Sequence, residues 1–160
     1  MRRNQAFTIA AIAILAIGMM SLAACKTSGM ALTQRGQVLK LNIEHPTDLP
    51  EQGEDNLGIV VSNRGVKDIK NVMVDVELPP QLIVLDQTNE REVMASHDSG
   101  SNMYHFTIGN VNVGEDVRIG FRVRTAFGTY RETGSVKVTA WQSDLPGDKL
   151  VETAVIKLRQ

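Results

Sequence analysis

Apolar and polar residues alternate with a period of two through most of this 160-residue chain. Leu39, Leu41 and Ile43 alternate with polar residues, and the pattern returns over residues 72–78, 117–123 and 136–140. Successive side chains of a β-strand point to opposite sides of a sheet, so this period predicts strands with one buried face and one solvated face. No segment after residue 25 shows a helical period. The sequence therefore predicts an all-β domain.

Clusters of turn-forming residues separate the predicted strands, at 63–65, 79–80, 99–100, 114–115 and 146–147. Further strands are expected at 56–62, 82–85 and 150–158, with a less regular one near 92–95. Many short strands joined by turns are typical of an antiparallel β-sandwich, here of about seven to nine strands over residues 37–160. Asn63 and Gly65 suit a tight turn that needs a positive φ.

The first 24 residues have the layout of an export signal. Arg2 and Arg3 precede an apolar stretch over residues 6–20, and small residues close the segment before Cys25. The apolar stretch is shorter than the roughly 20 residues that a membrane-spanning helix needs. Its end resembles the lipobox of bacterial lipoproteins, formed here by Leu22, Ala23, Ala24 and Cys25.

The lipobox resemblance implies that residues 1–24 are removed and that Cys25 receives diacylglycerol and an acyl chain such as palmitate. The alternative is an ordinary signal peptide with a chance cysteine at the cleavage site. Cys25 is the only cysteine, however, and a lone thiol has no disulfide partner in an oxidising compartment. Each buried acyl methylene contributes about 0.8 kcal/mol, so several chains would form a lasting membrane anchor.

Lys26 follows the cysteine at a place where Asp marks inner-membrane retention in lipoproteins of enteric-type bacteria. The lysine resembles the outer-membrane class, so we expect the domain at the outer membrane, facing the periplasm or the surface. In a cell with a single membrane the same anchor would place it on the cell surface. Residues 25–36 are polar and predict a flexible tether.

The part of the chain after the leader is mildly acidic. It holds all 18 acidic residues and all but two of the 17 Lys and Arg residues, which gives a formal charge of −3. This balance gives no reason to expect a nucleic-acid partner.

Over about residues 39–156, several short motifs follow one another in an order that resembles that of a known family. Residues 61–65, 69–74 and 78–82 read Val-Ser-Asn-Arg-Gly, Ile-Lys-Asn-Val-Met-Val and Leu-Pro-Pro-Gln-Leu, and residues 106–115 and 138–144 supply later motifs. Together they are similar to the conserved-repeat domain of unknown function of bacterial and archaeal surface proteins. The resemblance implies an immunoglobulin-like sandwich that serves as a spacer, adhesive or assembly module, with no catalytic residues. Family members often occur in tandem and some are cross-linked by cysteines, whereas this chain has one copy and no cysteine in the domain.

We predict neither an enzyme nor a cofactor. His45, His97 and His105 do not stand at zinc-ligand spacing and are expected at the surface. Ser96, His97 and Asp98 are adjacent, whereas a catalytic triad assembles from separated segments. No glycine-rich phosphate loop is present.

We also predict no metal site. Asp144 and Asp148 on one predicted turn, and the acidic residues of 51–55 on another, are the candidates for calcium, which binds six to eight oxygens. Neither turn has the spacing of a calcium loop.

Two sets of outward side chains are candidates for contact with a partner or ligand. Arg118, Arg122 and Arg124 form a basic stripe that could meet anionic lipid, an acidic glycan or a protein; the alternative is a solvated face that protects the sheet from edge pairing. Trp141 has the opposite parity to its buried neighbours, and an exposed Trp often anchors an interface. A bulge, or cover from Phe127 and Tyr130, would bury it instead.

These observations favour a noncatalytic, membrane-anchored envelope lipoprotein whose sandwich is a structural or protein-binding module. One alternative is a cell-wall or carbohydrate-binding module that uses Trp141. Another is an enzyme whose polar pocket the sequence does not reveal.

Overall fold

The computed structural model describes residues 26–34, 36–91, 93–98, 100–128 and 132–159. Within these ranges the chain forms eleven strands and no helix. The strands are β1 (Lys26–Gln34), β2 (Gln37–Glu44), β3 (Asp48–Pro50), β4 (Glu54–Asn63), β5 (Ile69–Glu77), β6 (Leu82–Asn89), β7 (Met94–His97), β8 (Met103–Val111), β9 (Asp116–Thr125), β10 (Thr133–Gln142) and β11 (Leu145–Arg159).

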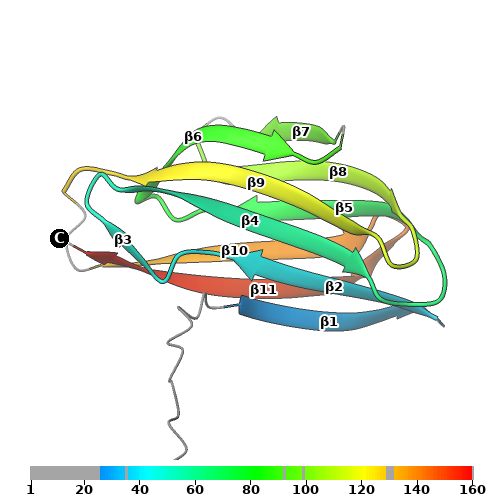
Figure 1. Ribbon diagram of the computed structural model, residues 1–160. Coiled ribbons are helices and arrows are strands. Elements are labelled where there is room, and N and C mark those ends of the chain that lie inside the picture. The colour runs from blue at the N-terminus through cyan, green and yellow to red at the C-terminus, as the bar shows by residue number, and fades with distance from the viewer. Residues whose placement is uncertain (1–25, 35, 92, 99, 129–131, 160) are drawn as a thin grey trace, which may run out of the picture.

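The strands form two sheets that pack face to face (Figure 1). One sheet has five strands in the order β1-β2-β4-β9-β6, and the other has six in the order β3-β11-β10-β5-β8-β7. Neighbouring strands run antiparallel, except that β3 runs parallel to β11. The predicted sandwich is confirmed, with more strands than expected because β1, the three-residue β3 and β8 are additional.

The period-two pattern places one face of each long strand in a shared core. Leu39, Leu41 and Ile43 of β2 are fully buried. At the centre, Phe106 of β8 meets Phe121 of β9 edge-on, with ring centroids 5.9 Å apart and an interplanar angle of 78°. Burying a large apolar side chain contributes about 1.5–3 kcal/mol, so the inward rows hold the two sheets together. The two outward faces are left for other roles.

Asn63, the last residue of β4, closes one end of the sandwich. Its side chain is fully buried, and its amide nitrogen donates to the carbonyl oxygens of Lys67 at 2.8 Å and Val111 at 3.0 Å. Its side-chain oxygen accepts from the Gly65 amide at 2.9 Å. One side chain therefore joins the loop after β4 to the end of β8.

Gly65 serves this turn differently from the prediction. Neither Asn63 nor Gly65 has a positive φ, whereas Gly36 and Asn71 nearby do, at 85° and 53°. A Cβ atom on Gly65 would lie 2.3 Å from the carbonyl oxygen of Gly36 and 2.7 Å from the amide nitrogen of Val38. The glycine is needed because the backbone that leads into β2 passes directly against it.

The predicted tether over residues 25–36 is wrong for most of its length. Lys26–Gln34 form strand β1, which pairs with β2 from Lys26 opposite Glu44 to Gln34 opposite Gln37. Without β1, strand β2 would leave a row of backbone amides and carbonyls unpaired, and a polar sequence can satisfy them as well as an apolar one. Within the described part of the chain, the sandwich therefore already includes Lys26.

Candidate functional site

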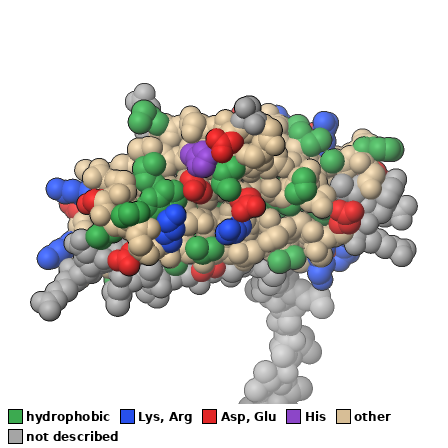
Figure 2. Space-filling view, turned by 180° about the vertical axis from the view of Figure 1, so that it is seen from behind, with side chains coloured by type: hydrophobic (Ala, Val, Ile, Leu, Met, Phe, Trp, Pro, Cys, Tyr) green, Lys and Arg blue, Asp and Glu red, His purple; other side chains and the backbone are tan. Residues whose placement is uncertain are grey.

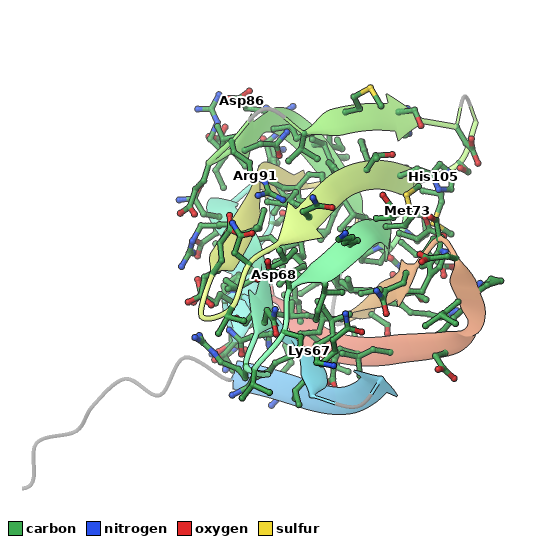
Figure 3. The ribbon with its side chains drawn as sticks, turned by 90° about the vertical axis from the view of Figure 1, so that its right-hand side faces the viewer. Lys67, Asp68, Met73, Asp86, Arg91 and His105 are labelled. Carbon is green, nitrogen blue, oxygen red and sulfur yellow. The ribbon has the colours of Figure 1, made fainter. Side chains whose placement is uncertain are left out.

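The two contact candidates lie on opposite faces of the sandwich. Trp141 belongs to β10 in the six-stranded sheet, and the arginines belong to β9 in the five-stranded sheet. Both sets point outward, since the alternate residues of each strand are the buried ones. Figure 3 shows the separation, with Met73 and His105 on one side of the molecule and Asp86 on the other. The candidates therefore do not form one site.

Trp141 points away from the core, as its parity predicts. It is half-buried, while Ala140 and Gln142 on either side of it are buried. A bulge between these two neighbours in the pairing with β11 does not turn the ring inward. Phe127 is 78% exposed and gives the ring no cover, and Tyr130 lies outside the described residues. The Lys149 ammonium lies 4.8 Å from the ring centroid instead.

The strand register extends Trp141 into a row across four strands. Trp141 stands opposite Met73, Met73 opposite Thr107, and Thr107 opposite Met94. We call these four residues, of which all but Thr107 are apolar, the apolar row. Met94 is 74% exposed on the edge strand β7. Figure 2 shows this face, where hydrophobic side chains gather beside a histidine and acidic side chains.

His105 lies next to the apolar row, between two carboxylates. Its Nδ1 is 2.7 Å from Asp75 and its Nε2 is 3.2 Å from Asp98, and its side chain is 34% exposed. The hydrogen bonds with Asp75 and then Asp98 raise the pKa of His105 above its ordinary value of 6.5, because they stabilise the imidazolium. Each ring nitrogen therefore has a carboxylate partner, which holds the ring in place on the outer face of the sheet.

Two of the three arginines of the predicted basic stripe pair with carboxylates. Arg118 pairs with Glu44 and also lies 3.3 Å from Glu90, and Arg122 lies 3.9 Å from Glu54. The hydrogen bond to Glu44 raises the pKa of Arg118 still further. Arg124 is exposed and stands opposite Glu54 in the register. Exposed pairs of this kind contribute only about 0–1 kcal/mol each, so the stripe matches the alternative of a solvated face.

A hollow of about 540 Å³ lies on the same outer face of the five-stranded sheet. Its floor contains Gly58 and Gly120, which stand opposite one another on β4 and β9. The side chain of Thr88 fills the space above Gly120, where a Cβ atom would lie 2.6 Å from the Thr88 hydroxyl oxygen. Among the described residues, no buried side-chain polar atom that lacks a hydrogen-bond partner lines this hollow.

The remaining candidates do not gather into a site. Asp144 is exposed on the turn between β10 and β11, whereas Asp148 is exposed within β11, contrary to the single predicted turn. No group of three or more His, Cys, Asp or Glu side chains in the described ranges could hold a metal ion. His45 is buried, contrary to the predicted surface position, because its ring packs at the end of β2 with Nδ1 2.9 Å from the Pro46 carbonyl oxygen. His97 stacks on Tyr104 at 4.4 Å.

The lipobox residues Leu22, Ala23, Ala24 and Cys25 lie outside the described residues. Across the ranges that are described, the chain has no helix that is long and apolar enough to cross a membrane.

No model of a known protein family matches this sequence, and no curated protein matches it. Solved structures do match the fold. The RrgA Jo.In complex gives a TM-score of 0.57 at 11% identity over 81% of this chain and 82% of that chain. AvmM, which catalyses macrocyclization in alchivemycin A biosynthesis, gives 0.53 at 12% identity over 79% of this chain and 90% of that chain. A non-cellulosomal cohesin from the archaeon Archaeoglobus fulgidus gives 0.48 at 12% identity over 71% and 86%.

The fold is an immunoglobulin-like β-sandwich. At these identities the likeness establishes the fold alone. Because AvmM is an enzyme, sharing this fold does not separate catalysts from binding modules, and the distinction rests on the surface of this chain. The resemblance to the conserved-repeat family stays a prediction, since its family model is not matched.

Sequence reasoning missed the cluster around His105. Asp75 and His105 are 30 residues apart and meet only because β5 pairs with β8 in one particular register. The alternation of apolar and polar residues in the two segments does predict that both side chains point outward. Parity assigns each residue to a face, but it does not identify the neighbour across the strand.

Proposed function

We propose that this protein is a lipid-anchored domain of the bacterial envelope that binds a protein partner through the outer face of its six-stranded sheet. The observation that carries the proposal is the apolar row, which continues to an edge residue, Met94, that is 74% exposed. The opposite face of the sandwich carries paired charges at the equivalent positions. An interface therefore fits the first face better.

The chemistry of the row suits recognition of a protein. Trp141 offers a large, stiff anchor, and tryptophan is enriched among the residues that dominate binding energy. Met73 and Met94 carry flexible, polarizable side chains that adapt to the shape of a partner. Beside them, His105 and Asp75 form a hydrogen-bonded polar pair, and polar groups at an interface give orientation more than affinity.

The anchor rests on the lipobox resemblance at Leu22, Ala23, Ala24 and Cys25. Lipid at Cys25 would fix where the domain acts, and the sandwich would supply the contacts. Because Met73 and Met94 extend the contact face beyond the single aromatic ring of Trp141, we favour a protein partner over a glycan.

The partner face is tested by crosslinking in the native cell followed by mass spectrometry. Met94→Lys and Met73→Lys place a charge in the apolar row, and we expect each to reduce the recovered partner at least tenfold, which corresponds to about 1.4 kcal/mol. Ile83→Lys is the matched control, because Ile83 is an exposed aliphatic residue, 42% exposed, on the other sheet. Equal recovery from all three variants would show that the face is not the interface.

The anchor is tested separately by Cys25→Ser. The variant should leave the membrane fraction or accumulate as an unprocessed precursor. A processed variant that stays in the membrane fraction would contradict the lipid anchor while leaving the partner face open to its own test.

A further inference from the structure

One strand of the six-stranded sheet carries an outward row of cationic and aliphatic side chains. Along β11 the exposed positions from 149 to 157 are Lys149, Val151, Thr153, Val155 and Lys157, which we call the β11 stripe. Val151 is 48% exposed and Val155 is 54% exposed. The stripe contains no acidic residue, in contrast to the paired charges around Arg118 on the other face.

The β11 stripe runs along one long edge of the sandwich. Strand β10 lies on one side of β11. On the other side, β3 pairs only with residues 157–159, so most of β11 forms the edge of its sheet. Strand β1, the edge of the other sheet, packs beside β11. Figure 1 shows β1 and β11 together along the lower edge and β6 and β7 along the upper one.

The chain enters the sandwich at this edge. Lys26 is the first residue of β1 and is already paired with Glu44, and Cys25 is one peptide bond away. Consecutive Cα atoms are about 3.8 Å apart, so a lipid on Cys25 would have no tether to separate it from the strand. The edge formed by β1 and β11 would be held against the bilayer.

We propose that the β11 stripe is a membrane-contact surface that lies on anionic phospholipid headgroups. This rests on the proposed lipid anchor. Val151 and Val155 enter the interface between headgroups and acyl chains, while Lys149 and Lys157 extend their ammonium groups to lipid phosphates. The β11 stripe determines how the domain is oriented on the membrane, whereas the lipid on Cys25 alone keeps the domain attached to it.

Two labelled variants of the full, lipidated chain test the orientation. Cys25 is the only cysteine and is consumed by the lipid, so Val155→Cys and Ile83→Cys each provide one reactive thiol for a fluorophore. Ile83 is the matched control, since it is a partly exposed aliphatic residue on β6 at the opposite edge. The proteins are reconstituted in vesicles of phosphatidylethanolamine and phosphatidylglycerol that contain a lipid-borne quencher.

We expect several-fold stronger quenching at position 155 than at position 83. Adding Lys149→Glu and Lys157→Glu, or replacing the vesicles by pure phosphatidylcholine, should lower the occupancy of the bound orientation on the order of tenfold and remove most of the contrast. Equal quenching at the two positions would overturn the proposal, and a contrast that survives charge reversal would overturn the role of anionic lipid. Neither of these two outcomes would contradict the lipid anchor at Cys25. If the labelled proteins do not sediment with vesicles at all, the anchor itself fails and the orientation fails with it.

Discussion

Replacing Asn63 by alanine should destabilise the sandwich more than any other single loss of a polar side chain at that end. The side chain of Asn63 is fully buried and makes three hydrogen bonds, to Lys67, Val111 and Gly65. The bond to Val111 is buried, and the bonds to Lys67 and Gly65 are partly buried. The change removes the donor or acceptor from all three at once.

The cost follows from the bonds lost. A hydrogen bond contributes about 1 kcal/mol net, so three give about 3 kcal/mol, and leaving the buried Val111 carbonyl oxygen without this donor adds up to about 1 more. The expected loss for Asn63→Ala is therefore about 3–4 kcal/mol. A domain of this size has about 5–15 kcal/mol of stability in total, so the variant should still fold but melt well below the wild type.

Urea unfolding followed by the fluorescence of the single tryptophan measures this loss. Asn56→Ala is the matched control, because Asn56 is exposed on the same strand β4 and its change should stay within about 0.5 kcal/mol. If Asn63→Ala costs less than about 1 kcal/mol, the hydrogen bonds do not close this end and the reasoning is refuted.

His105→Gln should flatten the pH dependence of stability above pH 6.5. Because the pKa of His105 is raised in the folded state, its contribution to stability is complete below pH 6.5 and is lost as the pH rises through the raised pKa. Urea unfolding across that pH range measures the difference between the variant and the wild type. Asp75→Asn should lower the pKa of His105 in an NMR titration, and an unchanged pKa would show that the Asp75 contact is not its cause. Gly65→Ala should cost about 1–3 kcal/mol because its Cβ atom would meet backbone atoms at 2.3 Å, while Gly147→Ala, with open space around it, should change unfolding by no more than about 0.5 kcal/mol.

The sequence predicts the strands of this domain well where one face of a strand is buried. Leu39, Leu41 and Ile43 are fully buried as their alternation requires, and Trp141 points outward as its parity requires. Period two reflects which side of the sheet faces the core, so it survives in any sandwich that these strands could form. For the same reason it cannot distinguish one strand order from another.

Features that depend on pairing between distant strands were not predictable in this way. Strand β1 has no apolar alternation to announce it and owes its structure to the backbone of β2. The arginines of β9 read as a basic stripe because their acidic partners come from other strands, with Glu44 lying 74 residues before Arg118. Asp75 and His105 likewise depend on the register of β5 with β8.

The strand order of the six-stranded sheet lets the two proposed surfaces work together. In the order β3-β11-β10-β5-β8-β7, four strand spacings of about 4.8 Å separate β11 from β7, so Met94 stands about 19 Å from the β11 stripe across the sheet. A domain that rests on its β1 and β11 edge would therefore hold the exposed end of the apolar row away from the bilayer. In that orientation Trp141 on β10, under Lys149, would lie nearer the bilayer, and Met94 would lie at the open side. A partner that approaches from the open side meets Met94 and His105 first, which is why substitution of Met94 should weaken capture of the partner without changing attachment to the membrane.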